Sequence, residues 1–481
     1  MIDKIIKEFR GEILSDIPTI EFRDLHTNSK LVEEQDVFIA IKGLTVDGHK
    51  FIPNVVERGA KLVFVSKKDV PLYDGIGCIY IENLAQVVGK LAKMFYNYPE
   101  KKLKFIGITG TNGKTTTSFM IEQMMQCPVV KIGTVEYKVG DVCFDAPNTT
   151  PEPVQLTRLF NLAVQKGIEW VVMEVTSHAL ELKRVEDIEF DVAIFTNLTQ
   201  DHLDFHVTME NYFQAKAKLF SMLKNEKNAV INCDDEWGEK LFESYPNAAT
   251  FSLIKQATLQ GEIVSESLQG MQAKLTYEGK AYTTHIPYLG EYNLQNVLTT
   301  LLTVCKTGVN FEYLIKQCES LSQVPGRFEL IANEQGKIVV VDFAHTSDAL
   351  ENILITIKGL AKGKITTVFG AGGDRDKTKR PLMAKIAAKY SDYVVVTSDN
   401  PRTENPKKIM IDVIEGLHEV DFSGERYKVI ENREEAIHFA IENAKMNDVV
   451  LIAGKGHEQY QIIGREKFHF SDQEVARKYL K

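Results

Sequence analysis

The chain has 481 residues, which is too long for one hydrophobic core and predicts roughly three domains. With 44% hydrophobic and 26% charged residues, its composition is that of an ordinary globular protein in water. The formal net charge of -9 argues against a general affinity for nucleic acid or an anionic membrane, so an anionic ligand must be held by local basic clusters.

The cysteines and the first residues indicate the compartment. The 6 cysteines are scattered without the spacing of a zinc site or a disulfide framework. Charges at the N-terminus are too closely spaced for a signal sequence, and no apolar run approaches a membrane span of about 20 residues. We therefore expect a cytoplasmic protein without disulfides, structural metal or membrane segment.

Residues 1–100 predict a small α/β domain. Short strand patterns at 36–41, 62–66 and 78–82 alternate with helix-like segments at 51–58 and 85–95. Two polar turns, at 28–30 and 43–48, read alone as plain loops. No residue of this domain indicates chemistry by itself.

The stretch at 103–125 predicts a phosphate-binding turn. A buried-strand pattern runs into Thr109-Gly-Thr-Asn-Gly-Lys-Thr115 and then into a helix. Gly110 and Gly113 let backbone N–H groups face an anion at a helix N-terminus, and Lys114 adds a full charge. Thr115 is then placed to hold Mg²⁺. Ile108 stands where a strict P-loop has its first glycine, so this is a narrower variant.

Residues 101–324 predict a mostly parallel sheet around that turn. Strand candidates at 168–175, 191–196 and 229–232 are separated by helical segments. Ligands bind at the carboxyl ends of such strands, where Glu174, His178 and the run 201–206 fall. Taken singly, Glu174 reads equally well as a solvated strand end and His202 as a loop histidine. Together with Thr115 they offer ligands for one metal-nucleotide centre.

Lys216 lies on a helical stretch, 211–220, that Thr208 could cap. By itself this residue reads as a solvated surface lysine. Residues 257–288 are richer in Thr, Tyr and Val and predict an antiparallel excursion before a helix that opens at Glu291.

Residues 325–481 predict a Rossmann-like doubly wound domain. Strand candidates at 338–341, 365–369, 393–397 and 449–453 each end in a polar cluster. The clusters are Asp342-Phe-Ala-His345, Gly370-Ala-Gly-Gly-Asp-Arg375, Asp399-Asn-Pro-Arg402 and Gly454-Lys-Gly-His-Glu458. Because these clusters fall on one edge of the sheet, a ligand cleft is favoured over a set of solvated loops.

These motifs resemble the Mur ligases of peptidoglycan synthesis, along essentially the whole chain. The resemblance is carried by the glycine-rich turn, Asn148-Thr-Thr150, Glu174-Val-Thr-Ser-His178 with Arg184, the run 196–206, Asn293 and Asn296, Pro325-Gly-Arg327 and the C-terminal clusters. It implies three α/β domains, at 1–100 for UDP, 101–324 for ATP and 325–481 for the incoming amino acid. It also implies a monomer that binds neither nucleic acid nor membrane.

The resemblance implies an ATP- and Mg²⁺-dependent amide ligase working through an acyl phosphate. The residues implied in catalysis are Lys114, Glu174, His202 and Lys216. Those implied in metal binding are Thr115, Glu174, His202 and Lys216, the last as a carbamate. Those implied in ATP binding are Gly110, Thr111, Asn112, Gly113, Lys114, Thr115, Thr116, Asn293, Arg327 and Asp342. The carbamate role overrides the reading of Lys216 as a surface residue.

The resemblance also implies where the substrates bind. The acceptor would be UDP-N-acetylmuramoyl-L-alanyl-D-glutamate, held by Ser29, Leu44, Thr45, Val46, Asn148, Thr149, Thr150, Thr176 and Arg184. The incoming amino acid would be meso-diaminopimelate or a near-isosteric diamino diacid such as meso-lanthionine. It would be held by Arg375, Asp399, Asn400, Pro401, Arg402, Gly454 and Glu458. Arg402 with Arg375 suits the far carboxylate of a diacid, which L-lysine lacks.

Three alternatives remain. The first is the same ligase using L-lysine. The second is a folylpolyglutamate synthase, which shares the glycine-rich turn and the acyl phosphate chemistry but lacks the Asn-Pro-Arg cluster and a uridine-binding N-terminal domain. The third is a GTPase-like switch, which the sequence disfavours because it has no Asn-Lys-x-Asp motif to read guanine.

Overall fold

The fold is described from a computed structural model that covers residues 1–43, 46–422 and 424–481. The described residues form two compact units, Met1–Ile106 with Cys127–Asp191, and Gly107–Gln126 with Val192–Lys481. Both contain helices and strands, and the predicted α/β class is confirmed. No helix in the described part of the chain has the length and apolarity needed to cross a bilayer.

The first unit carries two groups of strands. One sheet has the order β1-β5-β4-β3-β2, from β1 (Glu12–Ser15), β2 (Leu25–His26), β3 (Val37–Ala40), β4 (Leu62–Val65) and β5 (Gly77–Tyr80). The helices beside it are α1 (Ile2–Phe9), α2 (Ile52–Glu57) and α3 (Leu84–Phe95). Further along the chain come β7 (Val129–Ile132), β8 (Glu136–Val139), β9 (Val142–Asp145), α5 (Pro153–Gln165), β10 (Trp170–Glu174) and α6 (Ser177–Glu181), with the strand order β10-β7-β8-β9.

The second unit begins with β6 (Lys104–Thr109), whose carboxyl-terminal half belongs to it. The strand order is β16-β15-β14-β13-β12-β11-β6, from β11 (Val192–Phe195), β12 (Ala229–Asn232), β13 (Ala249–Ser252), β14 (Leu259–Ser267), β15 (Gly270–Tyr277) and β16 (Lys280–Ile286). Strands β11 to β14 run parallel, whereas β14, β15 and β16 form the predicted antiparallel excursion. The helices are α4 (Lys114–Met124), α7 (Leu203–His206), α8 (Met209–Ala217), α9 (Glu236–Ser244), α10 (Glu291–Lys306) and α11 (Phe311–Gln317).

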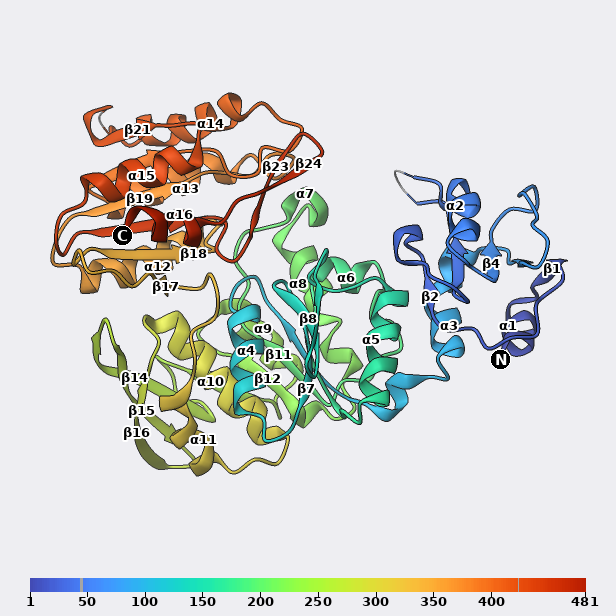
Figure 1. The fold of residues 1–481 in the computed structure, drawn as a ribbon. Coiled ribbons are helices and arrows are strands. Elements are labelled where there is room, and N and C mark those ends of the chain that lie inside the picture. Colours follow the sequence, from blue (N-terminus) through green and yellow to red (C-terminus); the bar gives the residue numbers. More distant parts are fainter. Residues whose placement is uncertain (44–45, 423) are drawn as a thin grey trace. The chain divides into compact units, whose positions relative to one another are not determined.

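A second sheet in this unit has the order β17-β18-β22-β19-β20-β21 (Figure 1, orange to red). Its strands are β17 (Glu329–Leu330), β18 (Ile338–Asp342), β19 (Ile365–Phe369), β20 (Tyr393–Val396), β21 (Tyr427–Val429) and β22 (Val449–Ala453), and β18 to β22 pair in parallel. The remaining elements are α12 (Ser347–Leu360), α13 (Lys379–Tyr390), α14 (Pro406–His418), α15 (Arg433–Asn443), α16 (Asp472–Tyr479) and the hairpin β23 (Tyr460–Ile463) and β24 (Glu466–His469).

Alternating side chains of this sheet build two separate cores. Val340, Leu451 and Val394 pack with α12, α13 and α14, while their neighbours Val341 and Ile452 pack with α15 and α16. This alternation follows from the two-residue repeat of a strand. The sheet is therefore doubly wound, as predicted, and its carboxyl ends are left to carry polar loops.

Candidate functional site

The glycine-rich turn between β6 and α4 has a backbone conformation that residues with a Cβ atom rarely adopt. Gly110 has φ 147 and Gly113 has φ 86. A Cβ atom at Gly110 would lie 1.8 Å from Oγ1 of Thr196, and one at Gly113 would lie 2.5 Å from Oδ1 of Asn296. The two glycines are thus required by both conformation and close packing.

The turn is held by the segment that follows β11. The backbone N–H of Thr111 donates to the carbonyl of Asn197 at 2.9 Å, and the N–H of Asn112 donates to Oδ1 of Asn197 at 2.9 Å. On α12, Oδ2 of Asp348 accepts from Nδ2 of Asn112 at 2.7 Å. Gly113 caps α4 without a side-chain hydrogen bond, and Thr115 and Thr116 are buried in its first turn. Such a rigid helix N-terminus suits a phosphate group.

Two lysines converge on this turn. Nζ of Lys114 donates to the carbonyls of Gly110 at 2.8 Å and Thr111 at 2.9 Å. Nζ of Lys216, on α8, donates to the same Gly110 carbonyl at 2.8 Å. Lys216 is only 2% exposed, so the reading of this residue as a solvated surface lysine is wrong. Burial, together with the nearby charge of Lys114, holds the pKa of Lys216 well below its usual value.

His202 and Lys216 lie against the same aromatic ring. The ring centroids of His202 and Tyr212 are 6.0 Å apart, and Nζ of Lys216 lies 4.5 Å from the centroid of Tyr212. Nε2 of His202 is 3.5 Å from Oδ2 of Asp201, a buried carboxylate whose Oδ1 is 3.6 Å from Nζ of Lys379. His202 is therefore part of a structured polar group, although its own side chain is 43% exposed.

The other predicted nucleotide residues are also buried or stacked. Asn293 is 3% exposed and accepts a hydrogen bond from Nδ2 of Asn296 at 3.3 Å. Asp342 accepts from the N–H groups of Phe328 at 2.6 Å and Ala344 at 2.7 Å, and burial raises its pKa. The guanidinium of Arg327 lies 4.4 Å from the ring centroid of Phe343. Asn293 is linked through Asn296 to the glycine-rich turn, since Asn296 packs on Gly113.

In the first unit, Glu174 is buried at the end of β10. Its carboxylate accepts from the N–H and the hydroxyl of Thr134, both at 3.0 Å. The Thr149 and Thr134 hydroxyl oxygens are 3.1 Å apart, and the hydroxyl of Thr150 donates to the carbonyl of Glu174 at 2.9 Å. The hydroxyl of Thr150 also accepts from the N–H of Thr176 at 3.1 Å.

Arg184 and Asn148 complete this group. Nη1 of Arg184 donates to the carbonyl of Thr150 at 3.0 Å, and the carbonyl of Asn148 accepts from the hydroxyl of Tyr137. Asn148, Thr149, Thr150, Thr176 and Arg184, which are predicted to bind the acceptor substrate, are therefore grouped around the carboxyl end of β10.

The residues predicted to bind the uridine end, Ser29, Leu44, Thr45 and Val46, come much earlier in the sequence than that group. Ser29 opens a short 3-10 helix, Ser29–Leu31, which Asn28 caps. The side chain of Val46 is 50% exposed. Leu44 and Thr45 lie outside the described residues. A cavity of about 350 Å³ in this unit is lined by Arg23, Asp24, His26 and Arg158, among others, and by none of the predicted site residues.

The predicted amino-acid residues meet at the carboxyl ends of β19, β20 and β22. The N–H of Gly373 donates to the carbonyl of Asn400 at 2.9 Å, and Nη1 of Arg402 donates to the carbonyl of Gly373 at 2.8 Å. A Cβ atom at Gly373 would lie 1.9 Å from the carbonyl oxygen of Pro401, and one at Gly454 would lie 2.7 Å from Oδ2 of Asp399. Three of the predicted clusters, 370–375, 399–402 and 454–458, are thus in direct contact.

The side chains at this edge differ in their contacts and in their exposure. Nδ2 of Asn400 donates to Oε2 of Glu458 at 2.8 Å, so these two predicted residues are joined. Arg402 is half-buried and has φ 50, whereas Arg375 is exposed. The predicted pairing of the two guanidinium groups around one carboxylate stays a prediction.

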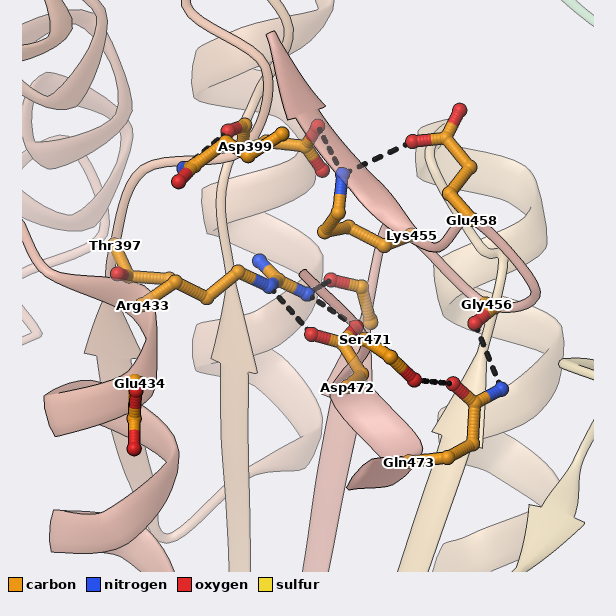
Figure 2. Close-up of polar contacts among 12 residues, drawn as sticks. Thr397, Asp399, Arg433, Glu434, Lys455, Gly456, Glu458, Ser471, Asp472 and Gln473 are labelled. Atoms are coloured by element: carbon orange, nitrogen blue, oxygen red, sulfur yellow. Dashed lines mark hydrogen bonds and ion pairs between the residues drawn. The ribbon is translucent and has the colours of Figure 1, made fainter. Parts of the chain in front are cut away.

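Sequence reasoning missed several buried charges beneath this edge (Figure 2). Lys455 is 0% exposed and contacts both Asn400 and Glu458. Arg433 forms a bidentate pair with Asp472, and neither side chain is exposed. The position of Lys455 between two glycines, Gly454 and Gly456, is a sequence feature that could have identified it. Arg433 lies at the start of a charged helix in the sequence, where nothing distinguishes it from a solvated residue.

The donors available for a metal are oxygen-rich. Within the described ranges, no three His, Cys, Asp or Glu side chains are grouped as metal ligands. The predicted set instead combines the Thr115 hydroxyl, the Glu174 carboxylate, the His202 imidazole and a modified Lys216. Glu174 belongs to the first unit and the others to the second. The Thr115 hydroxyl, the Glu174 carboxylate and the oxygens of a carbamate on Lys216 would fit Mg²⁺, which prefers oxygen ligands.

Comparison with known families matches three segments of the chain. Residues 21–96 match "Mur ligase family, catalytic domain", residues 108–304 match "Mur ligase middle domain", and residues 326–456 match "Mur ligase, glutamate ligase domain". The three matches follow one another in the order of the predicted domains.

Individual proteins are similar over nearly the full length. A UDP-N-acetylmuramoyl-L-alanyl-D-glutamate--2,6-diaminopimelate ligase of Fusobacterium nucleatum is 44% identical over 466 residues, which are 96% of this chain and 94% of the relative. A solved structure with the same description is 32% identical, with a TM-score of 0.61 over 98% of this chain and 96% of that one. The MurF ligase of Thermotoga maritima in complex with ADP shares the fold at 21% identity, with a TM-score of 0.68 over 95% of this chain and 97% of that one.

Proposed function

Because the chain belongs to the Mur ligase family, we propose that it is an ATP-dependent ligase that joins 2,6-diaminopimelate to UDP-N-acetylmuramoyl-L-alanyl-D-glutamate. The relatives that match its full length carry this activity in their names. The observation that carries the proposal is the pairing, within one unit, of a rigid phosphate-type turn with a polar cluster at the ends of β20 and β22. The expected place of action is the cytoplasm, in peptidoglycan precursor synthesis, and we expect a monomer.

The proposed reaction proceeds through an acyl phosphate. The glutamyl carboxylate attacks the γ-phosphorus of ATP, the bond to the bridging oxygen breaks, and ADP leaves. The amino nitrogen of the incoming residue then attacks the acyl carbon, loses a proton, and the C–O bond to phosphate breaks as the amide forms. Lys114 and the N-terminus of α4 stabilise the negative charge on the transferring group. Asn293, Arg327 and Asp342 would hold the rest of the nucleotide.

Mg²⁺, when bound, would neutralise charge on the phosphoryl oxygens. Thr115 and Glu174 would hold one ion, and His202 with a carbamate on Lys216 would hold a second. The burial of Lys216 supports the carbamate, because a lowered pKa leaves the amine neutral and nucleophilic toward CO₂. The product is an anion, so the modification also places a negative charge beside Lys114.

The substrates divide between the units. Ser29, Leu44, Thr45 and Val46 would meet the uridine end of the acceptor. The group around Thr150 and Arg184 would lie nearer the reacting carboxylate. Arg402 would bind the far carboxylate of the diamino diacid, with Asn400 and Glu458 beside it. Diaminopimelate and its thioether analogue lanthionine fit this proposal equally, because both end in a carboxylate and an amine.

The test is the release of phosphate from ATP by the purified protein. We expect release only when UDP-N-acetylmuramoyl-L-alanyl-D-glutamate and a diamino diacid are both present, with an amide product of matching mass. A panel of meso-diaminopimelate, meso-lanthionine, L-lysine and L-glutamate identifies the amino acid. Release with a folate acceptor in place of the nucleotide sugar would contradict the proposal.

A further inference from the structure

Lys455 is a buried cation at the centre of the C-terminal cluster. It follows β22, is 0% exposed, and lies between Gly454, with φ 116, and Gly456, with φ 52. Its Nζ lies 3.0 Å from Oε2 of Glu458 (Figure 2). The same Nζ lies 3.2 Å from Oδ1 of Asn400. A buried charge is costly unless it is paired, so these contacts fix where the ammonium can lie.

The three side chains form a closed ring of contacts. Asn400 accepts from Lys455 through Oδ1 and donates to Glu458 through Nδ2 at 2.8 Å. Oε2 of Glu458 therefore receives two donors, while Figure 2 shows its other oxygen directed away from Lys455. Asp399 adds a further carboxylate, with Oδ1 at 4.0 Å from Nζ of Lys455. One ammonium thus orients an amide and two carboxylates that come from two different loops.

The backbone is anchored before Lys455 by Arg433 of α15 and after it by the start of α16. Arg433 holds Asp472 through Nε at 2.7 Å and Nη2 at 2.8 Å, and its Nη2 also donates to the carbonyl of Ala453 at 3.0 Å. Nε2 of Gln473 donates to the carbonyl of Gly456 at 2.8 Å (Figure 2). Lys455 therefore lies on a turn that is tied down before it and after it, so its ammonium is presented from a rigid support.

We propose that Lys455 is a positioning residue that sets the preference for a diamino diacid, by orienting Asn400 and Glu458 and by balancing the charge of Glu458 and Asp399. The inference rests on the proposed function, because it takes this cluster as the amino-acid site. L-Lysine and diaminopimelate differ in the far carboxylate. The charge of Lys455 compensates the carboxylates of Glu458 and Asp399, so these two do not attract the side-chain ammonium of L-lysine. Selection then depends on Arg402, which would bind the far carboxylate of the diacid.

The variant Lys455→Met removes the charge and keeps the length of the side chain. We expect the KM for meso-diaminopimelate to rise about tenfold or more, as loss of a charged hydrogen-bond partner implies, with the KM for ATP unchanged within about twofold. The ratio of kcat/KM for the diacid to that for L-lysine should fall by a similar factor. Lys455→Arg, which keeps the charge, should recover part of the ratio.

The matched control is Lys478→Met, the same change at a lysine of α16 that is 62% exposed, pairs with Glu434 and lies over the ring of Tyr479. It should behave as the wild type. If Lys455→Met does not fold, as judged by its thermal unfolding, Lys455→Gln keeps a donor without the charge and the same ratio decides. If the wild type is active and a folded Lys455 variant keeps the same ratio of kcat/KM for the diacid to that for L-lysine, the role of Lys455 is overturned. The proposed function is not affected by that result. A wild type that releases no phosphate with any diamino acid overturns the proposed function, and this inference with it.

Discussion

The ammonium of Lys216 and the carbonyl oxygen of Gly110 lie 2.8 Å apart, and Lys114 donates to that same oxygen at the same distance. Two cations thus share one acceptor in a buried place. The arrangement favours loss of a proton from Lys216, whose pKa is lowered by burial and by the charge of Lys114. A neutral amine beside the phosphate-type turn is the form that carbon dioxide can modify.

Lys216→Ala should therefore lose nearly all ligase activity, and short carboxylic acids such as acetate should restore part of it. The added acid would supply the oxygen ligands that a carbamate gives in the wild type. The measurement is phosphate release against acetate concentration, with Lys227→Ala, at an exposed lysine, as the control. Full activity of Lys216→Ala at limiting Mg²⁺ would show that no carbamate is needed.

Lys114→Ala should abolish ligation while the fold persists. Lys114 lies on the turn, and its charge would stabilise the transferring phosphoryl group, a contribution worth roughly 100-fold or more in rate. Circular dichroism and the thermal midpoint should stay near those of the wild type. Near-normal turnover would refute the assignment of 109–115 as the nucleotide turn.

Gly110→Ala should damage both folding and activity. The added methyl group would lie 1.8 Å from the Thr196 hydroxyl oxygen, and φ 147 is a conformation that alanine rarely adopts. We expect a lower thermal midpoint and a higher KM for ATP. The comparison is Gly359→Ala, where a Cβ atom would meet no heavy atom within 4 Å. Equal behaviour of the two variants would mean that the turn relaxes freely.

Arg402→Ala should lose the diacid more than L-lysine. A guanidinium can bind a far carboxylate in a bidentate manner, which is worth a factor of about 10 to 100. In the wild type, kcat/KM for meso-diaminopimelate should exceed that for L-lysine by more than about tenfold. In Arg402→Ala, the ratio of the two kcat/KM values should be smaller. Equal use of both amino acids by the wild type would overturn the diacid assignment.

Glu404 couples stability to pH in the same region. It accepts from Nη2 of the buried Arg380 at 2.8 Å and from the N–H of Asp374 at 2.6 Å. The hydrogen bond from Arg380 lowers the pKa of Glu404 from 4.5 to about 2. A carboxyl group with a depressed pKa stabilises the fold fully above its unfolded value and loses this contribution as the pH falls through the folded value.

Glu404→Gln should thus lower the free energy of unfolding by about 1 to 3 kcal/mol at pH 7. The gap between variant and wild type should hold down to a pH near 4.5 and then shrink toward pH 2. Urea unfolding at several pH values measures it, with exposed Glu425→Gln as the control. A gap that stays constant below pH 4 would show that Glu404 carries no such linkage.

Much of the fold followed from patterns in the sequence. The strands predicted at 229–232, 365–369 and 449–453 are found at those residues, because buried parallel strands are short apolar runs with clear ends. Thr208 caps α8 as predicted, with its hydroxyl accepting from the N–H of Asn211. The polar clusters could be predicted for the same reason, since they end strands of one parallel sheet.

The buried charges could not be predicted in this way. Nothing in the local helix patterns distinguishes Lys216 or Arg433 from a solvated residue. Their burial depends on contacts with Gly110 and Asp472, which are distant in the sequence. A local pattern records which residues alternate along an element, but it does not record which distant carbonyl or carboxylate will meet a side chain. The sharing of Glu458 with Lys455 was missed for this reason as well.

The last helix, α16, supports the turn around Lys455 from outside the cluster, since Asp472 pairs with Arg433 and Gln473 donates to the carbonyl of Gly456. Without Asp472, the buried Arg433 guanidinium would be left as an uncompensated charge, which is strongly unfavourable. A chain shortened to end at Phe470 should therefore leave the loop of Lys455 and Glu458 open to proteases that the full chain resists.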